Sequence, residues 1–543
     1  MQERREFDPG DHEAGLVAVL RELASLPSWD ARALDALLRR HPRDGHGLFS
    51  RSDLLAGLGA FAAQLGIGER RDELAEGLRR RRVRTLSGVA PVTVFTKPHP
   101  CPGRCIFCPT DVRMPKSYLS AEPGCQRAAQ YAFDPFAQTA GRVRDLRAIG
   151  HAVDKVELIV LGGTWSSYPL AYRIWFVKRC LDALNGGGDA DEARGSVEAA
   201  EWRELEATQR ANEGAELRCV GLSLETRPDH VTRKEVLALR RLGATKIQLG
   251  VQSTSDDVLA RNARGHGVAE TRAAMTLLRS AGFKLHAHWM PNLLGSSVGD
   301  DLADFERLFA DPALRPDELK IYPCFLIEGT ELVAHWRVGA WRPYTDEELV
   351  ALLADCMART PRWCRLTRII RDISAQDILA GSKTANLRQL AEVRLAATGR
   401  ETHEIRAREI RADAPASSDA RLRETGYASV NGREFFIEAD TDADRLLGFA
   451  RLSLPDDPPW IDELRDAALL RELHVYGSLA PLGAHAAQHT QHRGLGQRLL
   501  ARAADLAREA GYKRLAVISA VGTRGYYEAR GFRRGDLYQS IDL

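Results

Sequence analysis

Cysteine and methionine are scarce in this sequence. Its 543 residues include nine cysteines and five methionines, and 44% of the residues are hydrophobic. Nine cysteines in a chain of this length exclude the disulfide framework of a small secreted protein. Apolar runs long enough to span a bilayer are also lacking, and the first residues, MQERREFDPGDHE, have no apolar signal core. We therefore expect a globular protein in a reducing cytoplasm, without a membrane partner.

Charge of one sign does not dominate either. The 76 Lys and Arg against 74 Asp and Glu leave a formal net charge of +2, but the cations are clustered. Residues 69–88 read ERRDELAEGLRRRRVRTLSG, at the start of a basic segment that reaches Arg104, and residues 365–390 read RLTRIIRDISAQDILAGSKTANLRQL. Such stretches suit a polyphosphate partner. By charge alone, a solvated helix face and a linker are the preferred explanation.

The first two parts of the chain differ in their hydrophobic pattern. Residues 1–82 show apolar residues at three- and four-residue spacing, which predicts a small helical subdomain with a basic end, and Ser52 is the expected N-cap of its third helix. Residues 83–384 alternate short β-branched runs with helical segments. Six such units predict a parallel sheet rolled into a partial (β/α)6 barrel, with catalytic side chains at the carboxyl ends of the strands. The runs begin at Ala90, Lys155, Arg218, Thr245, Phe283 and Glu318.

The pattern changes again in the last third of the chain. A polar insert at residues 185–216 is expected at the surface of the barrel, and residues 385–420 are expected to form a linker. Residues 421–543 predict an α+β domain. REFFIEADTDADRLLGFARLSL is typical of a hairpin about an Asp-rich turn, LLRELHVYG and YKRLAVISA of strands, and QHRGLGQRLLARAADLAREAG of a glycine-containing loop that enters an amphipathic helix. The fold class is therefore α/β, with a helical subdomain before the barrel and an α+β domain after it.

Three of the nine cysteines lie within eight positions. Cys101, Cys105 and Cys108 have the spacing C-x3-C-x2-C, in the loop after the first barrel strand. Three thiolates fill three positions of a four-iron cluster and leave the fourth iron open, where S-adenosylmethionine can chelate it. Spacing, loop and barrel together resemble the radical-SAM superfamily, in which the reduced cluster cleaves this cofactor to a 5′-deoxyadenosyl radical. The alternative is a structural zinc site with a fourth ligand elsewhere.

Other barrel residues fit the same cofactor. Gly162 and Gly163 in LGGT end the second strand, where bare backbone can approach the methionine amino group. Glu225 in GLSLETRPD and Gln248 in KIQLGVQS lie at the ends of the next two strands and would point polar groups into the barrel mouth. Phe107 would shield the cluster or the adenine. Each residue is a weak signal by itself, since a glycine pair is more often only a turn.

The C-terminal part carries a second motif. QHRGLG, residues 491–496, matches the Q/R-x-x-G-x-G/A loop of the GNAT acetyltransferases, whose backbone amides at a helix start bind the pyrophosphate of coenzyme A. Tyr526 and Tyr527 lie where these enzymes keep a tyrosine that protonates the leaving thiolate. Glu472 or His474, on one face of a strand, could act as a base, and His474 could equally be structural. The residues expected at acetyl-CoA are Glu472, His474, Val475, Gln491, Gly494, Leu495 and Gly496.

Seven stretches indicate a family. With RTLSGVAPVTVFTKPHPCPGRCIFCP, GLSLETRPD, LKIYPCFLIEGTEL, RDISAQDILAGSKTANLRQL, HEIRAREIR, RELHVYG and VISAVGTRGYYEARGF, the chain resembles the catalytic subunit of Elongator, in a single-chain microbial form, from about Arg84 to its C-terminus. The resemblance implies a radical-SAM acyltransferase that carboxymethylates the wobble uridine of tRNA at C5. It implies a 4Fe-4S cluster, S-adenosylmethionine and acetyl-CoA as cofactors. The implied partners are the tRNA anticodon region and an electron-donor protein, and no DNA.

The resemblance also implies a reaction course. The deoxyadenosyl radical would take a hydrogen atom from the acetyl methyl group, the resulting carbon radical would add to C5 of the base, and thioester hydrolysis would leave a carboxymethyl group. The basic stretches would contact tRNA phosphates and position the anticodon without reading its sequence. The target base would have to be extruded into the barrel mouth.

Some residues and functions stay open. Lys320, at the end of a barrel strand, resembles a family lysine near the substrate and is expected to be catalytic, with the two tyrosines. Some members hold zinc near the domain junction; Cys324, Cys356 and Cys364 are candidate ligands, but Thr402 stands where relatives often have cysteine. Two alternatives are a protein lysine acetyltransferase with a structural barrel and a tRNA-binding scaffold without chemistry. The clustered cysteines argue against the first, and the glycine loops and tyrosines argue against the second.

Overall fold

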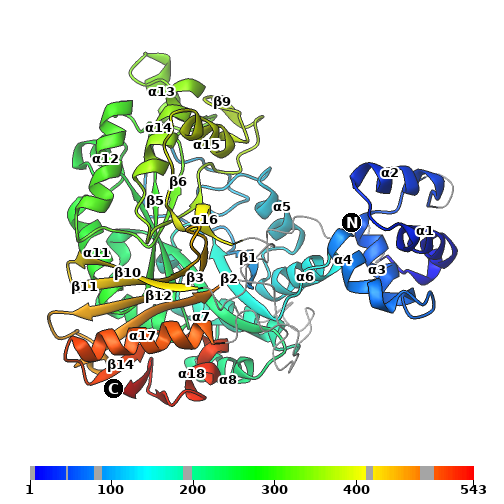
Figure 1. The fold of residues 1–543 in the computed structure, drawn as a ribbon. Helices are drawn as coiled ribbons and strands as arrows, with labels where there is room; N and C mark the ends of the chain where they lie inside the picture. Colours follow the sequence, from blue (N-terminus) through cyan, green and yellow to red (C-terminus); the bar gives the residue numbers. More distant parts are fainter. Residues whose placement is uncertain (1–6, 44–46, 79–87, 188–197, 411–419, 477–493) are drawn as a thin grey trace.

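The computed structural model describes residues 7–43, 47–78, 88–187, 198–410, 420–476 and 494–543, and the structural statements below concern these residues. Figure 1 shows three parts in chain order. A helical bundle lies at one side, a parallel sheet surrounded by helices occupies the centre, and a second sheet carries the C-terminus.

The N-terminal part is a helical bundle, as predicted. Its helices are α1 (Glu13–Ser25), α2 (Ala31–Arg40), α3 (Arg51–Phe61) and α4 (Arg71–Leu78). Their apolar faces form a core of their own, in which leucines such as Leu16 and Leu37 are fully buried. The arginine run at residues 79–82 lies outside the described residues.

The predicted N-cap of α3 is wrong by two residues. Ser50 Oγ accepts a hydrogen bond from Asp53 N at 3.1 Å, and Asp53 Oδ2 accepts one from Ser50 N at 2.8 Å. This reciprocal pair is a capping box. Ser52 already has its place inside the helix, so its side chain cannot cap the first turn.

Seven parallel strands form the central sheet, in the order β1-β2-β3-β4-β5-β6-β8. The six predicted strands are all present, and β8 adds a seventh beside β6. Strands that follow one another in the sequence are neighbours in the sheet, as a rolled β/α barrel requires. The strands are β1 (Ala90–Phe95), β2 (Lys155–Leu161), β3 (Arg218–Thr226), β4 (Lys246–Gln252), β5 (Lys284–Trp289), β6 (Glu318–Ile321) and β8 (Arg365–Arg368).

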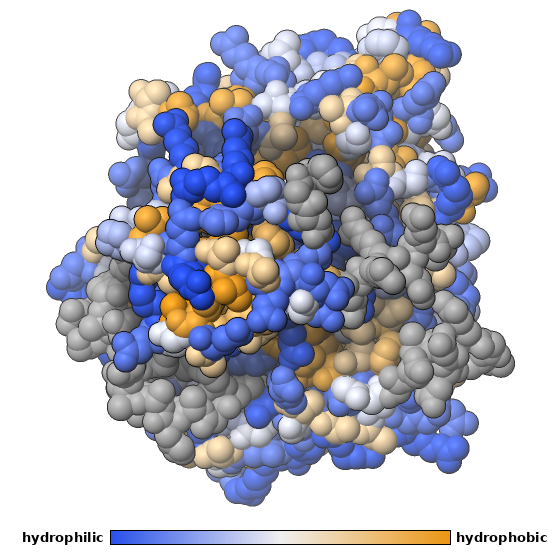
Figure 2. Space-filling model, turned by 90° about the vertical axis from the view of Figure 1, so that its right-hand side faces the viewer, coloured by the Kyte–Doolittle hydropathy of each residue, from blue (hydrophilic) through white to orange (hydrophobic). Residues whose placement is uncertain are grey.

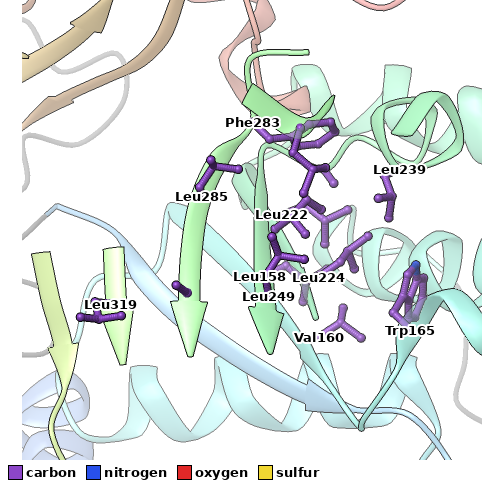
Figure 3. Packing of buried hydrophobic residues seen from close by; sticks show 14 of the residues in the cluster. Leu158, Val160, Trp165, Leu222, Leu224, Leu239, Leu249, Phe283, Leu285 and Leu319 are labelled. Atoms are coloured by element: carbon purple, nitrogen blue, oxygen red, sulfur yellow. The ribbon is translucent and has the colours of Figure 1, made fainter. Parts of the chain in front are cut away.

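Helices cover the outer face of this sheet. Figure 3 shows Leu158, Leu222 and Leu249, from three neighbouring strands, packed into one apolar core. Successive side chains of a strand point to opposite faces. On each strand, the residues next to these leucines therefore point into the barrel. The helices that contribute to this core are α6 (Pro135–Ala148), α7 (Leu170–Leu184), α9 (Arg233–Arg241), α11 (Val268–Ser280), α12 (Val298–Ala310) and α14 (Asp346–Arg359). Helix α5 (Pro123–Gln130) packs in a separate cluster with Phe95, and Val258 of α10 (Asp256–Arg261) packs in another.

Smaller elements complete the barrel. The insert expected at the surface contains α8 (Trp202–Glu213), which packs against α7 through buried residues such as Leu205. A short two-stranded sheet, β7 (Leu326–Ile327) with β9 (Ile378–Ala380), lies beside α13 (Leu332–Arg337). These additions lie outside the order of the seven parallel strands and leave it unbroken.

The C-terminal part is a second seven-stranded sheet, in the order β10-β11-β12-β13-β14-β16-β15. Strands β11 and β12 form the predicted antiparallel hairpin. The amphipathic helix α17 (Leu495–Glu509) buries its apolar side in the core of this sheet. The remaining elements are β10 (Arg421–Ser429), β11 (Gly432–Asp440), β12 (Leu446–Pro455), β13 (Ala467–Val475), β14 (Arg514–Val517), α18 (Arg524–Glu528), β15 (Arg533–Arg534) and β16 (Gln539–Asp542).

The segment expected as a linker is partly helical and buried. It contains α15 (Leu387–Ala397), whose apolar side packs into the barrel core, and α16 (Ile405–Arg408), where Ile405 belongs to the C-terminal core. Residues of both sheets also share one core, since Leu469 and Tyr538 pack in the same apolar cluster as Leu285. The barrel and the C-terminal domain are therefore joined by an extended hydrophobic contact.

No helix of the described part of the chain is long and apolar enough to cross a membrane. Hydrophilic residues predominate on the side of the molecule shown in Figure 2, and the hydrophobic areas between them are small.

Candidate active sites

The three clustered cysteines lie in the loop that follows β1, at the carboxyl end of the barrel. All three thiols are free and partly accessible. Gly103 N donates to Cys101 Sγ at 3.4 Å, Thr164 Oγ1 lies 3.5 Å from the same sulfur, and Cys108 N donates to the carbonyl of Cys105 at 3.0 Å. The sulfur of Cys101 is thus contacted by the backbone of its own loop and by Thr164, which follows β2.

The spacing of the sulfurs fits a cluster better than a single ion. Among the described residues, donor atoms of three potential ligands come within 4.8 Å of one another only at Glu438, Asp440 and Asp444. At least one pair of the three sulfurs is therefore more than 4.8 Å apart, whereas the ligands of one tetrahedral zinc lie about 3.8 Å from each other. A four-iron cube takes each thiolate on a separate iron. The structural-zinc alternative would need the loop to rearrange.

Two arginines that the sequence reasoning missed surround these sulfurs. Arg264 Nη1 donates to Cys105 Sγ at 3.3 Å. Arg227 is buried, and its Nη1 has no hydrogen-bond partner although it lies close enough to Gly103 to exclude a side chain there. Buried N–H donors are seldom left unpaired, so this orphaned donor fits an anionic group, such as a thiolate-bound cluster or a carboxylate. Arg227 follows Glu225 by two residues in the stretch GLSLETRPD. Its place directly after a barrel strand is the sequence feature from which a role at the barrel mouth could have been predicted.

Burial opposes ionisation of one of these thiols, Cys108, without metal. It raises the pKa of Cys108 to about 12, and the adjacent Cys105 raises it further, while Lys116 and Arg371 lower it. Cationic iron reverses this effect, because a coordinating thiol is deprotonated. The residues present therefore fit a cluster chemically as well as in spacing.

Gly162 and Gly163 form a close backbone approach beside the cysteine loop. Their φ angles are 137° and 88°, which favour glycine. A Cβ atom on Gly162 would lie 1.9 Å from Thr96 Oγ1, and one on Gly163 would lie 3.3 Å from the Lys116 carbonyl. The next residue, Thr164, contacts Cys101. The glycine pair thus brings bare backbone to the cysteines, where the predicted cofactor amino group would lie.

The other predicted barrel residues meet in the barrel interior. Lys320 Nζ donates to Gln248 Oε1, and His288 Nε2 lies 3.1 Å from the same oxygen. Glu225 accepts a hydrogen bond from Tyr118 Oη at 3.2 Å and lies 3.9 Å from His288 Nδ1. Glu225, Gln248 and Lys320 therefore form one polar group. Tyr118 and His288 belong to it but were not predicted, because their partners lie far away in the sequence.

Burial changes the protonation of this group. It lowers the pKa of Lys320 to about 7, against the opposing effect of Glu225. Burial also raises the pKa of Glu225, although Lys320 opposes this. A lysine that is neutral in part near pH 7, beside a carboxylate, is an arrangement typical of a reactive site rather than of a structural ion pair.

The second site lies where β13 and β14 separate. The two strands pair in parallel only over Ala467–Leu470 of β13, so the remaining residues of β13 leave that edge unpaired. Gly494, with φ 97°, caps α17 next to this opening. A Cβ atom on Gly496 would lie 3.1 Å from Tyr526 Oη and 3.7 Å from Val475 Cγ2. Helix α17, the end of β13 and Tyr526 thus converge, as predicted for an acetyl-CoA site.

The structure distinguishes the two predicted tyrosines. Tyr526 is exposed, and the guanidinium of Arg530 stacks on its ring at 3.6 Å. Tyr527 is buried in the C-terminal core, where its ring packs against Phe532. Leu495 is likewise buried and contributes to the core. Its place at the helix start makes its backbone, not its side chain, available to a ligand.

The two candidate bases of β13 have different environments. Glu472 binds Arg451 Nε at 2.8 Å and also pairs with Lys284 of the barrel. His474 has a buried Nε2 without a hydrogen-bond partner, and its ring stacks on Phe449. Burial lowers the pKa of His474, whereas the pKa of Glu472 lies below its ordinary value because its cations outweigh its burial. Glu472 is therefore the ionised group at this site.

Comparisons with known proteins agree with both sites. Residues 99–305 match the Radical SAM superfamily, residues 316–397 a Radical_SAM C-terminal domain, and residues 400–532 the Acetyltransferase (GNAT) family. A tRNA uridine(34) acetyltransferase of Dehalococcoides mccartyi is 41% identical over 459 residues, which cover 83% of this chain and 96% of that protein. Elongator complex protein 3 of Schizosaccharomyces pombe is 36% identical over 87% of this chain and 88% of that protein.

The chain belongs to the Elongator complex protein 3 family. A solved structure of the archaeal Methanocaldococcus infernus Elp3 with an N-terminal deletion has a TM-score of 0.72 and 34% identity, and it covers 84% of this chain and 99% of that chain. The fold, a radical-SAM barrel followed by a GNAT domain, is thereby established. The two C-terminal matches meet between residues 397 and 400, inside the segment that was expected to be a linker.

Gln491 was expected at the CoA loop, and three cysteines were candidate zinc ligands at the domain junction. Gln491 lies outside the described residues. Cys324 packs in a different apolar cluster from Cys356 and Cys364, and all three thiols are buried, which raises the pKa of each. The described cysteines therefore do not assemble a zinc site at the domain junction.

The basic stretch at residues 365–390 is mostly engaged within the protein. Arg365 pairs with Glu409 at 2.5 Å, Arg371 with Glu122 at 2.7 Å, and Arg388 with Glu404 at 2.5 Å. Arg368 is exposed and pairs with the exposed Asp372 at 3.2 Å, and Lys383 is exposed. The expectation that this stretch is a tRNA surface is thus narrowed to a few cations, because the others stabilise the barrel.

Proposed function

We propose that this protein adds a carboxymethyl group to C5 of the wobble uridine of tRNA, with acetyl-CoA as the carbon source. The observation that carries this proposal is the presence of a cysteine loop with cluster spacing and a CoA-type helix start on two domains that share one core. The relatives named tRNA uridine(34) acetyltransferase support uridine 34 as the target. The carboxymethyl product rests on the radical chemistry that the barrel would add to acetyl transfer.

The cofactors divide the chemistry between the two sites. When bound, the 4Fe-4S cluster and S-adenosylmethionine supply the one-electron chemistry that removes hydrogen from an unactivated carbon, and acetyl-CoA supplies the two-carbon unit. Cys101, Cys105 and Cys108 would hold three irons. Gly162 and Gly163 would approach S-adenosylmethionine by backbone, and Arg227 and Arg264 would balance negative charge near the sulfurs.

The residues of the second site fit a thioester. The backbone amides from Gly494 to Gly496 open α17, and such amides bind phosphate oxygens without interference from a side chain. Tyr526 Oη holds a proton close to this helix start, which it can give to a leaving thiolate. Glu472 is ionised and can orient and deprotonate a water molecule. The proposed site therefore has an acid beside the start of α17 and a base on β13.

The polar group of the barrel fits the uracil base. Gln248, Lys320 and Glu225 present an amide, an amine and a carboxylate toward the barrel mouth, on the cysteine side. An extruded uracil offers two carbonyl oxygens and one N–H to such partners. Lys320, with a pKa of about 7, can bind a carbonyl oxygen as a cation or release its proton at neutral pH.

tRNA and an electron donor would be the partners. The candidates for phosphate contacts are the basic run at residues 79–82 of the sequence, the exposed Lys383, and Arg368, which is exposed and pairs with the exposed Asp372. Phosphate contacts position a nucleic acid without reading bases. The reduction of the cluster needs an electron from outside the chain, so we include a small redox protein among the partners.

Isotope labelling tests this function. The anaerobic, cluster-loaded protein is incubated with tRNA, S-adenosylmethionine, a reductant and acetyl-CoA labelled with ¹³C in both acetyl carbons, and the nucleosides are analysed by mass spectrometry. We expect a uridine that carries both labelled carbons as a carboxymethyl group, only with S-adenosylmethionine present. Label on protein lysines without S-adenosylmethionine would favour a lysine acetyltransferase. An unmodified tRNA with intact acetyl-CoA would contradict any catalytic role.

A further inference from the structure

The interior of the barrel is charged, although its outer face is apolar. Along β5, Lys284, His286 and His288 point inward, whereas Leu285 and Trp289 are fully buried in the outer core. Barrels of this kind usually fill their interior with branched apolar side chains. Buried charges cost free energy of folding unless they are paired. Apolar residues would therefore fill the interior at lower cost, and the fold alone does not explain these charged residues.

The charges at the amino end of the barrel form a connected set. Lys246 Nζ lies 3.2 Å from Glu318 Oε2 and also pairs with Glu157. Lys284 Nζ lies 3.5 Å from Glu318 Oε1. His286 Nδ1 lies 3.3 Å from the same carboxylate, without hydrogen-bond geometry. These residues come from four different strands and are held together by Glu318.

The set continues toward the cysteine end. The rings of His286 and His288 are 5.7 Å apart, and His288 Nδ1 lies 3.9 Å from Glu225. Lys284 and His288 are four positions apart on β5, a rise of about 13 Å. Titratable side chains therefore line the barrel from its amino end to the group that contains Glu225 and Lys320.

The same set crosses into the C-terminal domain at Glu472. Lys284 Nζ binds Glu472 Oε1, and Arg451 Nε of β12 binds Glu472 Oε2 at 2.8 Å. Glu472 therefore faces a cation of the barrel on one oxygen and a cation of its own domain on the other. Two anions of the barrel share these cations with Glu472: Glu318 lies 3.5 Å from Lys284, and Asp317 lies 3.4 Å from Arg451. On β13, His474 is the titratable neighbour of Glu472.

We propose that Lys284 is a positioning residue of the acetyl-CoA site, by which the barrel orients the Glu472 carboxylate and keeps it ionised. The acetyl-CoA site is then shared between two domains, and its base is incomplete without β5. This inference rests on the proposed function, because it takes Glu472 as the base that activates water. It adds that a residue of the radical-SAM barrel, not of the GNAT domain, tunes that base.

The charges around the Glu472 carboxylate determine its pKa. Burial raises the pKa of Glu472, but the charges of Lys284 and Arg451 lower it more, and Glu318 opposes them. Removal of Lys284 leaves a buried carboxylate with one cation instead of two. The pKa of Glu472 should then rise, and a smaller fraction of the base should be ionised at mildly acidic pH.

The test uses the full chain with Lys284→Met, which keeps the length of the side chain, and Lys284→Arg, which keeps its charge. Acetyl-CoA hydrolysis is followed as thiol release from pH 5 to pH 9. In Lys284→Met we expect the acid limb of the pH–rate profile to shift to higher pH, by about one pH unit or more, because the pKa of Glu472 rises. In Lys284→Arg, which keeps the positive charge, the acid limb should lie close to its wild-type pH. A merely structural role would lower the rate at every pH without moving the limb.

A second readout needs no turnover. Unfolding temperatures of the ligand-free wild type, Lys284→Met, Glu472→Gln and the double variant form a cycle. If the two side chains interact directly, the effects of the single changes should not add. Additive shifts would contradict the contact.

Lys246→Met is the matched control, because it removes a buried lysine of the same charge set that does not touch Glu472. Its acid limb should move much less than that of Lys284→Met, and an equal movement would contradict a specific role of Lys284. Wild-type hydrolysis by Glu472→Gln would contradict the proposed base and this inference together. An inactive Glu472→Gln with an unshifted Lys284→Met profile would contradict this inference alone.

Discussion

Lys320 shows how one residue of the barrel is set apart from an ordinary lysine. It is enclosed by the barrel, its Nζ contacts Gln248, and its ammonium lies near the ring of Tyr322 at 5.8 Å. Burial lowers its pKa to about 7, although the charge of Glu225 opposes this effect. A lysine in water keeps its proton up to a pKa of about 10.4. Between pH values of about 7 and 10.4, Lys320 therefore binds its proton in the unfolded chain and has lost it in the folded chain.

This difference predicts the pH dependence of stability. Between about pH 7 and pH 10 the unfolded chain binds the Lys320 proton and the folded chain does not, so the free energy of unfolding should rise with pH. The contribution is at most about 1.4 kcal/mol for each pH unit. We expect the unfolding temperature of the wild type, relative to Lys320→Met, to increase from pH 7 to pH 9. A constant difference across this range would show that Lys320 stays protonated in the fold.

Residues close together in the sequence were predicted best. The cysteines were singled out by their local spacing and by the strand pattern before them, and the structure places them in the expected loop after β1. Arg227 and Arg264 were missed, because each meets the cysteine loop only through the fold of distant strands. The sequence could not separate Tyr526 from Tyr527 either. Their difference depends on which side of α18 faces the core.

Among the elements, α17 has the clearest link between local structure and function. Its first residues lie beside the edge of β13 that β14 leaves unpaired. At Gly496 a side chain would have to share space with Tyr526 and Val475. A carboxylate there would also repel a pyrophosphate at the helix start. Gly496→Glu should therefore abolish measurable CoA binding in calorimetry, while Gly496→Ala should weaken it by a smaller factor.

Gly525→Glu provides a matched control for this prediction. Gly525 lies on α18 in the same domain and is exposed, and a Cβ atom added to it would meet no other atom within 4 Å. This variant should keep its affinity for CoA. Loss of binding in both variants would mean that the domain has been destabilised, and wild-type affinity in Gly496→Glu would contradict the assignment of the helix start.

Element prediction followed the strength of the repeating pattern. The six barrel strands and the hairpin of β11 and β12 were predicted because their apolar runs are long or alternate regularly. Strand β8 has only four residues and contains two arginines, so its sequence resembles a basic surface segment. Helix α15 was also missed. Its buried residues Leu387, Ala391 and Leu395 have helical spacing, but Leu390 and Val393 between them are apolar and exposed, which blurs the pattern. The tertiary contacts of these elements decide their structure.

At the scale of the whole molecule, ion pairs connect the two catalytic domains. Arg471 of β13 binds Asp317, just before β6, with two hydrogen bonds, and it also binds Glu434 at 2.6 Å. Arg451 lies 3.4 Å from Asp317 Oδ1. These side chains are fully or almost fully buried. Removal of one charge would leave its partners unsatisfied inside the interface.

Asp317→Asn should therefore destabilise both domains together. Loss of one partner of a buried ion pair costs about 3–5 kcal/mol. We expect one unfolding transition at a clearly lower temperature in calorimetry, because the domains share a core. The exposed pair of Arg533 and Asp542 is the control, and Arg533→Ala should change stability by less than about 1 kcal/mol. Two separate transitions in Asp317→Asn would show that the domains fold independently.

The central claim is that two sites in one molecule carry out one reaction on tRNA. The cysteine loop and the α17 helix start lie on different domains, so each can be removed while the other stays intact. Cys105→Ala removes one cluster ligand and should lower bound iron and stop cleavage of S-adenosylmethionine, but leave CoA binding. Gly496→Glu should do the reverse.

The most direct measurement is the formation of carboxymethyl-uridine by wild type, Cys105→Ala and Gly496→Glu. Each reaction contains tRNA, acetyl-CoA, S-adenosylmethionine and a reductant, and the nucleosides are quantified by mass spectrometry. The account predicts product from the wild type and none from either variant, because one site supplies the acetyl group that the other activates. Product from either variant at the wild-type rate would contradict it.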